Sequence, residues 1–309
     1  MVRTSRRSFL TQAVTVALAS SLRSTAWGAA PQFPIGLELY TVGESLTKDP
    51  AGTLHKVAAI GYQEVEVSGF GNLTPAAMRK LIDDAGLKCP AAHLQFGFKE
   101  TAVVLEQAKE LGVPFAASSI LLPPTDAPAA GGMGEVLSKL NGLTADDFKR
   151  IAELANKIGE ETKKAGVQFG YHNHTHEFRD LGDGKTGYAI LLAETDPALV
   201  QFEADCGWMT TAGVDPVHYF RTYPNRYRMI HVKDFPAGTK VTTTMGGASF
   251  PHPTELGRGH IDYKPILAAA RHAGVEHFFV EQDPPMVGMT PLEAAEVDYT
   301  YLKSISAQA

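Results

Sequence analysis

The chain has 309 residues, of which 44% are hydrophobic and 20% are charged, and its formal charge at pH 7 is −6. This composition is that of an ordinary soluble globular protein with enough apolar material for one large core, and it excludes a low-complexity chain. The length exceeds that of most single domains, but α/β barrels of this size are common.

The first thirty residues have the features of an export signal. Residues 5–10 read SRRSFL, a twin-arginine sequence, and are followed by the apolar run 13–22 and by small residues between Ala26 and Ala30. The apolar run is too short and too polar for a membrane span. We therefore predict a Tat (twin-arginine) signal over residues 1–30, a periplasmic or secreted protein, and no membrane anchor after cleavage.

Removal of this leader would make the chain more acidic. Cleavage after Ala30 removes four arginines and no acidic residue, which leaves 24 basic and 34 acidic residues and a formal charge of −10. Such a surface repels phosphates, so we expect no nucleic acid partner. The sequence leaves open whether the chain forms a homo-oligomer.

Beyond the leader, strand-like and helix-like segments alternate eight times. Strands are expected at 35–40, 62–67, 87–95, 113–120, from 166 into the histidine cluster, and at 199–204, 228–232 and 277–281. Helices are expected at 50–60, 74–85, 100–111, 144–165, 186–195, 216–222, 263–273 and 291–305, and a Pro/Gly/Ala-rich surface loop at 122–132. One such helix has Thr74 as its N-cap, Pro75 at its first position and Gly86 as its C-cap.

Eight β-then-α units predict parallel strands joined by helical crossovers, closed as a single (β/α)8 TIM barrel over residues 31–309. A doubly wound open sheet is the alternative. No glycine-rich nucleotide fingerprint follows the first expected strand, which favours the barrel.

Residues 172–177 hold three histidines and a glutamate directly after the fifth expected strand. Side chains in a strand alternate between faces, so His172 and His174 point the same way and Asn173 points the other way. Neutral imidazole is the commonest side-chain metal ligand, and a nearby carboxylate suits a divalent ion. The alternative is a polar loop whose histidines only form hydrogen bonds.

The other expected strands end in the same kinds of residue, at the edge where such barrels place their active sites. These residues are Glu66 and Ser68, His93 and Gln95, Asp205, His231 and Lys233, and Glu281. An unpaired buried carboxylate is costly, and a shared cation removes that cost. The set therefore predicts a metal site, although His93 could be a hydrogen-bonded core residue and Glu66 could pair with Lys233.

Several sequence blocks carry a family resemblance. They are His172–Phe178, Gly207-Trp208, Ala212–Pro216, His231–Asp234, Leu256–Tyr263 and Val280–Asp283. In this order they resemble the sugar phosphate isomerase/epimerase family, the xylose isomerase-like TIM barrels, over about residues 33–305. Inosose dehydratases, ketose 3-epimerases and hydroxypyruvate isomerases belong to this family, and so does endonuclease IV. The blocks are specific for the family and poor at choosing a reaction within it.

The resemblance implies one divalent ion, with Mn²⁺ favoured over Mg²⁺, Co²⁺ or Zn²⁺. It implies Asp205, His231 and Glu281 as ligands, with His172 at the fifth-strand position where ketose epimerases have a glutamate. Glu177 lies close to the sequence position at which the epimerases have a second glutamate, one that contacts the substrate. The alternative is that Glu177 binds the metal.

The family chemistry is proton abstraction next to a carbonyl, with the metal stabilising an enediolate. The resemblance therefore implies an isomerase or epimerase acting on a sugar or keto-sugar. A lyase acting on a keto-sugar, keto-glycoside or cyclitol is the alternative, and a non-catalytic carbohydrate-binding protein is less favoured. The catalytic candidates are Glu281, Lys233 and His174, and the substrate contacts are Glu177, Trp208, His93, Glu66 and Arg258.

Overall fold

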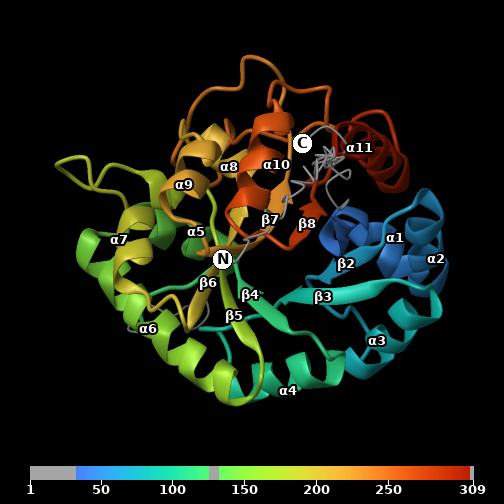
Figure 1. Ribbon diagram of the computed structural model, residues 1–309, viewed down its shortest axis with the longest axis horizontal. Coiled ribbons are helices and arrows are strands. Elements are labelled where there is room, and N and C mark those ends of the chain that lie inside the picture. The colour runs from blue at the N-terminus through green and yellow to red at the C-terminus, as the bar shows by residue number, and fades with distance from the viewer. Residues whose placement is uncertain (1–32, 125–131, 307–309) are drawn as a thin grey trace, which may run out of the picture. The chain divides into compact units, whose positions relative to one another are not determined.

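The computed structural model describes residues 33–124 and 132–306. The proposed signal over residues 1–30, and residues 125–131 of the expected loop, lie outside the described residues. Eight parallel strands close into a barrel in chain order, β1 to β8, and helices lie around it (Figure 1). The predicted (β/α)8 barrel is confirmed. In the described part of the chain, no helix combines the length and apolarity needed to cross a bilayer.

The strands are short and evenly spaced along the chain. They are β1 (Ile35–Glu38), β2 (Glu64–Val67), β3 (Lys88–His93), β4 (Phe115–Ser118), β5 (Gln168–His172), β6 (Val200–Asp205), β7 (Tyr227–Val232) and β8 (His277–Val280). The α-helices are α1 (Gly43–Lys48), α2 (Pro50–Ile60), α3 (Pro75–Asp84), α4 (Thr101–Leu111), α5 (Gly132–Gly142), α6 (Ala145–Lys164), α7 (Gly187–Glu194), α8 (Cys206–Thr211), α9 (Pro216–Thr222), α10 (Tyr263–His272) and α11 (Pro291–Ser306). Two short 3-10 helices are η1 (Leu39–Val42) and η2 (His176–Phe178).

Local sequence explains where several helices begin. The Thr74 side chain accepts a hydrogen bond from the Ala77 N–H at 3.2 Å and so caps α3, as predicted. Thr144 and Asp147 form a reciprocal capping box at the start of α6. Proline occupies the first position of α2, α3, α9 and α11, where its missing N–H costs nothing.

Three helices were not predicted. The helix α1 fills a gap before α2, and α5 covers residues 132–142, so the expected 122–132 loop overlaps it only at Gly132. The third, α8, starts directly after β6, because the Asp205 carboxylate accepts a hydrogen bond from the Trp208 N–H at 2.7 Å. With six residues each, α1 and α8 are too short for a periodic pattern to appear in the sequence, whereas α5, with 11 residues, is as long as the predicted α2 and α4.

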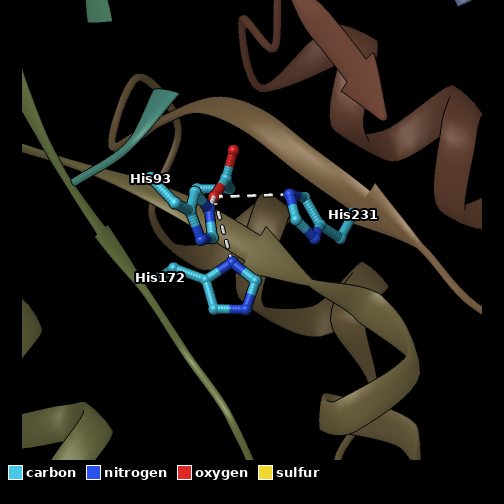
Figure 2. A group of neighbouring side chains, drawn as sticks. His93, His172 and His231 are labelled. Atoms are coloured by element: carbon cyan, nitrogen blue, oxygen red, sulfur yellow. Dashed lines mark hydrogen bonds and ion pairs between the residues drawn. The ribbon is translucent and has the colours of Figure 1, made fainter. Parts of the chain in front are cut away.

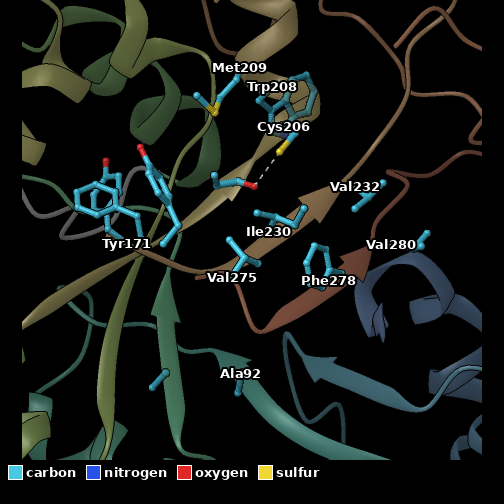
Figure 3. Close-up of a cluster of buried hydrophobic side chains, with 14 of the residues drawn as sticks. Ala92, Tyr171, Cys206, Trp208, Met209, Ile230, Val232, Val275, Phe278 and Val280 are labelled. Carbon is cyan, nitrogen blue, oxygen red and sulfur yellow. Dashed lines mark hydrogen bonds between the residues drawn. The ribbon is translucent and has the colours of Figure 1, made fainter. Parts of the chain in front are cut away.

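The main core lies between the barrel and its helices. Figure 3 shows Tyr171, Ile230 and Phe278 pointing outward from their strands, with Trp208 and Met209 of α8 nearby. Both cysteines, Cys89 and Cys206, are buried free thiols.

A second, small apolar cluster fills the middle of the barrel. It consists of Ala91, Ala117, Met229 and Phe279, which are fully buried. Gly36 and Gly170 leave the room for the two large members: a Cβ on Gly36 would lie 2.5 Å from the Phe279 ring, and one on Gly170 would lie 3.2 Å from Met229 Cε. This interior plug supports the layer of residues that lies above it, toward the C-terminal ends of the strands.

Candidate metal centre and active site

The layer above the plug is made of titratable side chains. Strand residues two positions apart share a face, so the inward position after Ala91 is His93, after Met229 it is His231, and after Phe279 it is Glu281. The same spacing brings in Glu38, Glu66, His172, Glu203 and Asp205 from the remaining strands. The fold therefore gathers at one point the acids and histidines that are far apart in sequence.

Within this layer, four residues form one candidate metal-binding group: His172, Asp205, His231 and Glu281. One donor atom from each lies within 4.8 Å of the corresponding atoms of the others. Two further groups overlap this one and draw on Glu38, Glu66, His93 and Glu203. Figure 2 shows how the rings of His93, His172 and His231 converge from three different strands.

The Asp205 carboxylate has one oxygen that accepts no hydrogen bond. Its Oδ1 caps α8, whereas the buried Oδ2 has no hydrogen-bond partner. Burial, with Glu281 close by, raises the pKa of Asp205 to about 6, although Lys233 opposes the shift. An unpartnered oxygen beside two imidazoles and a second carboxylate, with no thiolate in the set, fits a divalent cation.

Glu203 orients His172 within the four-residue group. Its Oε2 lies 3.0 Å from His172 Nδ1, while His172 Nε2 lies 4.0 Å from Asp205 Oδ2. Burial holds the pKa of His172 well below its usual value, and the neighbouring His231 adds to this effect. A neutral imidazole that donates from Nδ1 to Glu203 directs its Nε2 lone pair toward Asp205.

Glu66 holds His231 in a matching way. Glu66 Oε2 lies 2.7 Å from His231 Nε2, and Glu281 Oε2 lies 2.7 Å from His231 Nδ1. Burial opposes the imidazolium, but Glu203 and Glu281 outweigh it and raise the pKa of His231. Glu66 thus contacts His231 Nε2, while His231 Nδ1 faces Glu281, a member of the four-residue group. Glu66 contacts His231, and the alternative pairing of Glu66 with Lys233 is not seen.

His93 ties these two supporting carboxylates together. Its Nε2 lies 2.5 Å from Glu203 Oε2 and 3.6 Å from Glu66 Oε1. Burial disfavours the charged ring, yet Glu66 and Glu203 prevail and raise the pKa of His93 to about 10. His93 is therefore a cation that holds two acids in place.

Lys233 is a buried cation on the other side of the group. Its Nζ lies 2.9 Å from Glu281 Oε2, 2.8 Å from Asp283 Oδ2 and 3.4 Å from Asp205 Oδ2. Nζ also lies 4.5 Å from the centre of the Trp208 ring. Burial opposes its charge, but Asp283 and Glu281 outweigh burial and keep the pKa of Lys233 well above its usual value.

A cavity of about 710 Å³ lies against this layer. His93, His172, His174 and Glu281 are among its lining residues, whereas the predicted site residues Glu66, Asp205, His231 and Lys233 are buried and do not line it. Burial, together with the nearby Lys233, lowers the pKa of His174 to about 3. His174 is neutral as a result, and its buried Nδ1 has no hydrogen-bond partner.

Glu177 and Trp208, two expected substrate contacts, lie away from the cavity lining. The Glu177 carboxylate accepts the His174 N–H at 3.0 and 3.1 Å and the Tyr171 hydroxyl at 3.1 Å, so it binds backbone on the far side of the histidine segment. Trp208 is 3% exposed and packs against Phe235 and Phe250.

Arg258 also lies outside the cavity lining, where its guanidinium pairs with Glu255. The reason is the loop around it. The Asp234 carboxylate accepts hydrogen bonds from backbone N–H groups, including those of Gly257 and Gly259, at 2.8–3.2 Å. A Cβ on Gly259 would lie 2.1 Å from Asp234 Oδ1, so glycine is required for this close wrapping.

Sequence reasoning missed three members of the site: Glu38, Glu203 and Asp283. Strand ends were read as site positions, whereas Glu203 lies inside β6, two residues before Asp205 and on the same face. A second acid two residues before Asp205, on the same face of the strand, was the available signal. Asp283 follows β8 and lines the cavity together with Glu38.

Known proteins resemble the chain in both sequence and fold. The model of the family described as "Xylose isomerase-like TIM barrel" matches residues 54–304. An inosose dehydratase from Lacticaseibacillus casei is 25% identical over 281 residues, covering 81% of this chain and 89% of that protein. The crystal structure of a sugar phosphate isomerase/epimerase from Parabacteroides distasonis is 27% identical and covers 90% of this chain and 96% of that chain, with a TM-score of 0.68. An IolI protein solved with a bound zinc atom shares the fold at 13% identity and a TM-score of 0.61, with 89% and 98% of the two chains covered.

Proposed function

Because the chain belongs to the xylose isomerase-like TIM barrel family, we propose that it is a divalent-metal-dependent enzyme that removes a proton next to a carbonyl of a keto-sugar or inosose. The observation that carries this proposal is the buried four-residue group beside the cavity, in which Asp205 Oδ2 accepts no hydrogen bond. Small sugars are the substrates on which this family acts.

In this proposal His172, Asp205, His231 and Glu281 hold the ion. A bound divalent cation polarises a carbonyl oxygen and stabilises the charge that develops when the adjacent carbon loses its proton. A mixed nitrogen and oxygen donor set without thiolate favours Mn²⁺, and Mg²⁺, Co²⁺ or Zn²⁺ are the alternatives.

The remaining charged groups supply the proton chemistry. Lys233 places an ammonium group between Glu281 and Asp283, where it can donate to a developing oxyanion. Glu281 and Asp283 line the cavity and are the carboxylates nearest to that ammonium, so we propose them as the proton acceptors. His174 lines the cavity as a neutral ring and serves as a hydrogen-bonding group for the substrate.

The distribution of these acceptors favours one reaction class. Glu281 and Asp283 both follow β8, whereas the β5 side of the cavity presents only His172 and His174. Epimerisation needs a donor and an acceptor on opposite faces of the carbon. Elimination of water can use one face, because the carboxyl that takes the proton from carbon can return it to the departing hydroxyl, which leaves as water. We therefore propose a lyase, in keeping with the inosose dehydratase relative. Sugar isomerisation is the second candidate, since it also needs one acceptor and a sugar phosphate isomerase/epimerase shares the fold.

Turnover of a panel of keto-sugars and inososes by the Mn²⁺-loaded chain in D₂O tests the proposal. Mass spectrometry and proton NMR distinguish the outcomes. Elimination removes one water from the substrate and gives an enol that rearranges to a deoxy dione, whereas isomerisation gives a product that has lost no water and carries deuterium on one carbon. Asp205→Ala, which removes one candidate ligand, should lose both metal and activity. Full activity of that metal-free variant would contradict the role of the metal. No turnover by the loaded wild type would contradict the proposal and leave a carbohydrate-binding role.

A further inference from the structure

Exposed apolar side chains concentrate at the cavity. Among the described residues, six large hydrophobic side chains are exposed: Tyr40, Phe98, Val103, Met133, Val241 and Val287. Three of them, Tyr40, Phe98 and Met133, line the same cavity as the candidate metal group, with exposures of 49%, 40% and 61%. Exposing large apolar surface is costly, so a group of such residues around a cavity indicates an apolar ligand surface.

Most of the apolar lining residues come from a different part of the barrel than the candidate metal group, although Tyr40 belongs to η1, which follows β1. Phe98 and Leu94 follow β3, Ile120 follows β4, and Met133 and Val136 belong to α5. The candidate metal group is contributed by β5 to β8. Apart from His93, which lies in β3, the cavity therefore has a charged half and an apolar half.

Polar groups without charge lie on the same cavity wall. Ser68, Gln95, Ser118 and Ser119 follow β2, β3 and β4 and line the cavity. Hydroxyl and amide groups of this kind suit the hydroxyl groups of a sugar. Trp208, the aromatic residue expected to stack on a sugar, is buried, so Phe98 and Tyr40 are the aromatic rings accessible to a ligand there.

We propose that the apolar half is a subsite for an apolar or aromatic substituent attached to the sugar, so that the substrate is a glycoside-like molecule rather than a free monosaccharide. This inference rests on the proposed function for the position of the sugar ring, which lies against the charged half. The cavity volume of about 710 Å³ is in the range of sites that enclose ligands larger than one sugar ring. Phe98 and Met133 supply the flat and adaptable surfaces that an aromatic group packs against.

Binding of two matched probes tests the subsite. Phenyl β-D-glucoside and methyl β-D-glucoside differ only in the substituent, and calorimetry or saturation-transfer NMR compares their affinities for the full chain. Burial of a phenyl ring should make the phenyl glucoside at least about tenfold tighter. Phe98→Ala should reduce this ratio to about threefold or less and leave the methyl glucoside within about twofold of its wild-type affinity.

Val103→Ala is the matched control, because Val103 is also exposed and apolar but does not line the cavity. Met133→Ser provides a second, independent variant of the subsite. If the phenyl glucoside binds no better than the methyl glucoside, or does not bind, the subsite is wrong. Because the readout is binding, a chain that shows the preference but turns over no keto-sugar would contradict the proposed function and leave the subsite standing.

Discussion

At the scale of single residues, the carboxylate of Glu203 determines how two histidines are presented. Its Oε2 accepts from His172 Nδ1 at 3.0 Å and lies 2.5 Å from His93 Nε2. The first contact fixes the His172 tautomer, and the second holds a buried cation beside the acid. Burial opposes ionisation of Glu203, but His231 and His93 hold its pKa well below the usual value, so it stays an anion.

We predict that Glu203→Gln weakens metal binding without removing any ligand. Glutamine keeps the shape but loses the charge that pairs with His93, and loss of such a supporting partner typically costs about 10–100-fold in metal affinity. Metal titration of the purified variant measures this, and activity should recover in part at saturating metal. Glu160→Gln, an exposed change on α6, is the control. Wild-type affinity in Glu203→Gln would show that the contact is dispensable.

Lys233 gives a different prediction, because it contacts three carboxylates, whereas Glu203 contacts the histidines. Lys233→Met should retain its metal, since the variant removes a positive charge from the neighbourhood of Asp205 and Glu281. It should lose about 2–4 kcal/mol of transition-state stabilisation, the usual loss for one electrostatic donor. Elemental analysis and kcat/KM measure the two effects, with the exposed Lys240→Met as control. Loss of the metal in Lys233→Met would place Lys233 in the structural support of the ion instead.

The sequence predicts residues of this site best where they end a strand. Glu66, His93, His172, Asp205, His231 and Glu281 lie there, and the barrel topology alone brings them together. Glu203 could not be assigned a partner from sequence, because its role depends on side chains contributed by β3, β5 and β7. The positions of Arg258 and Trp208 likewise depend on loop packing that no local pattern encodes.

At the scale of elements, α11 is joined to the loop before α10 through one buried acid. Asp298 Oδ1 accepts the Leu256 N–H at 2.7 Å, while Oδ2 is buried without a partner. Burial, with a contribution from Glu255, raises the pKa of Asp298 to about 7, although the Leu256 N–H opposes the shift. The contact fixes the position of the loop that Asp234 also organises.

This acid predicts a pH dependence of stability. Between about pH 4 and pH 7 the unfolded chain releases the Asp298 proton while the folded chain keeps it, so the free energy of unfolding falls as the pH rises. Asp298→Asn removes this titration and should gain stability relative to wild type across that window, by up to roughly 4 kcal/mol at pH 8. Urea unfolding at several pH values measures it, with the exposed Glu296→Gln on the same helix as control. A stability difference that does not change with pH would rule the titration out.

Element prediction succeeded where local signals are strong. The helix starts at Pro50, Pro75, Pro216 and Pro291 were readable because proline and capping residues mark them. The helix α8 was missed because Asp205 has two roles, ending β6 and capping the next helix. A sequence pattern assigns one role to each residue, and tertiary structure can give it two.

At the scale of the whole barrel, an apolar plug supports a densely charged layer. Glu203 and Glu281 are held as anions and His93 and Lys233 as cations, either buried or at the cavity wall. The raised pKa of His231 favours its charged form too, so binding an ion there would release a proton. Several further acids share the same space, Asp205 with an oxygen that has no partner. Desolvating so many charges is unfavourable, and a divalent cation at the group would offset part of that cost.

We therefore predict that metal binding stabilises the entire domain. At a free Mn²⁺ concentration of about 100 times Kd, binding to the folded state alone adds about 2.7 kcal/mol. For a domain of this size that corresponds to an increase in Tm of roughly 5–10 °C. Thermal unfolding with a chelator and with increasing Mn²⁺ measures the shift, which should grow with the logarithm of the metal concentration. Asp205→Ala should respond little, because it lacks one carboxylate of the four-residue group, whose Oδ2 has no hydrogen bond in the protein. An equal shift in that variant would mean that the ion binds elsewhere on the molecule.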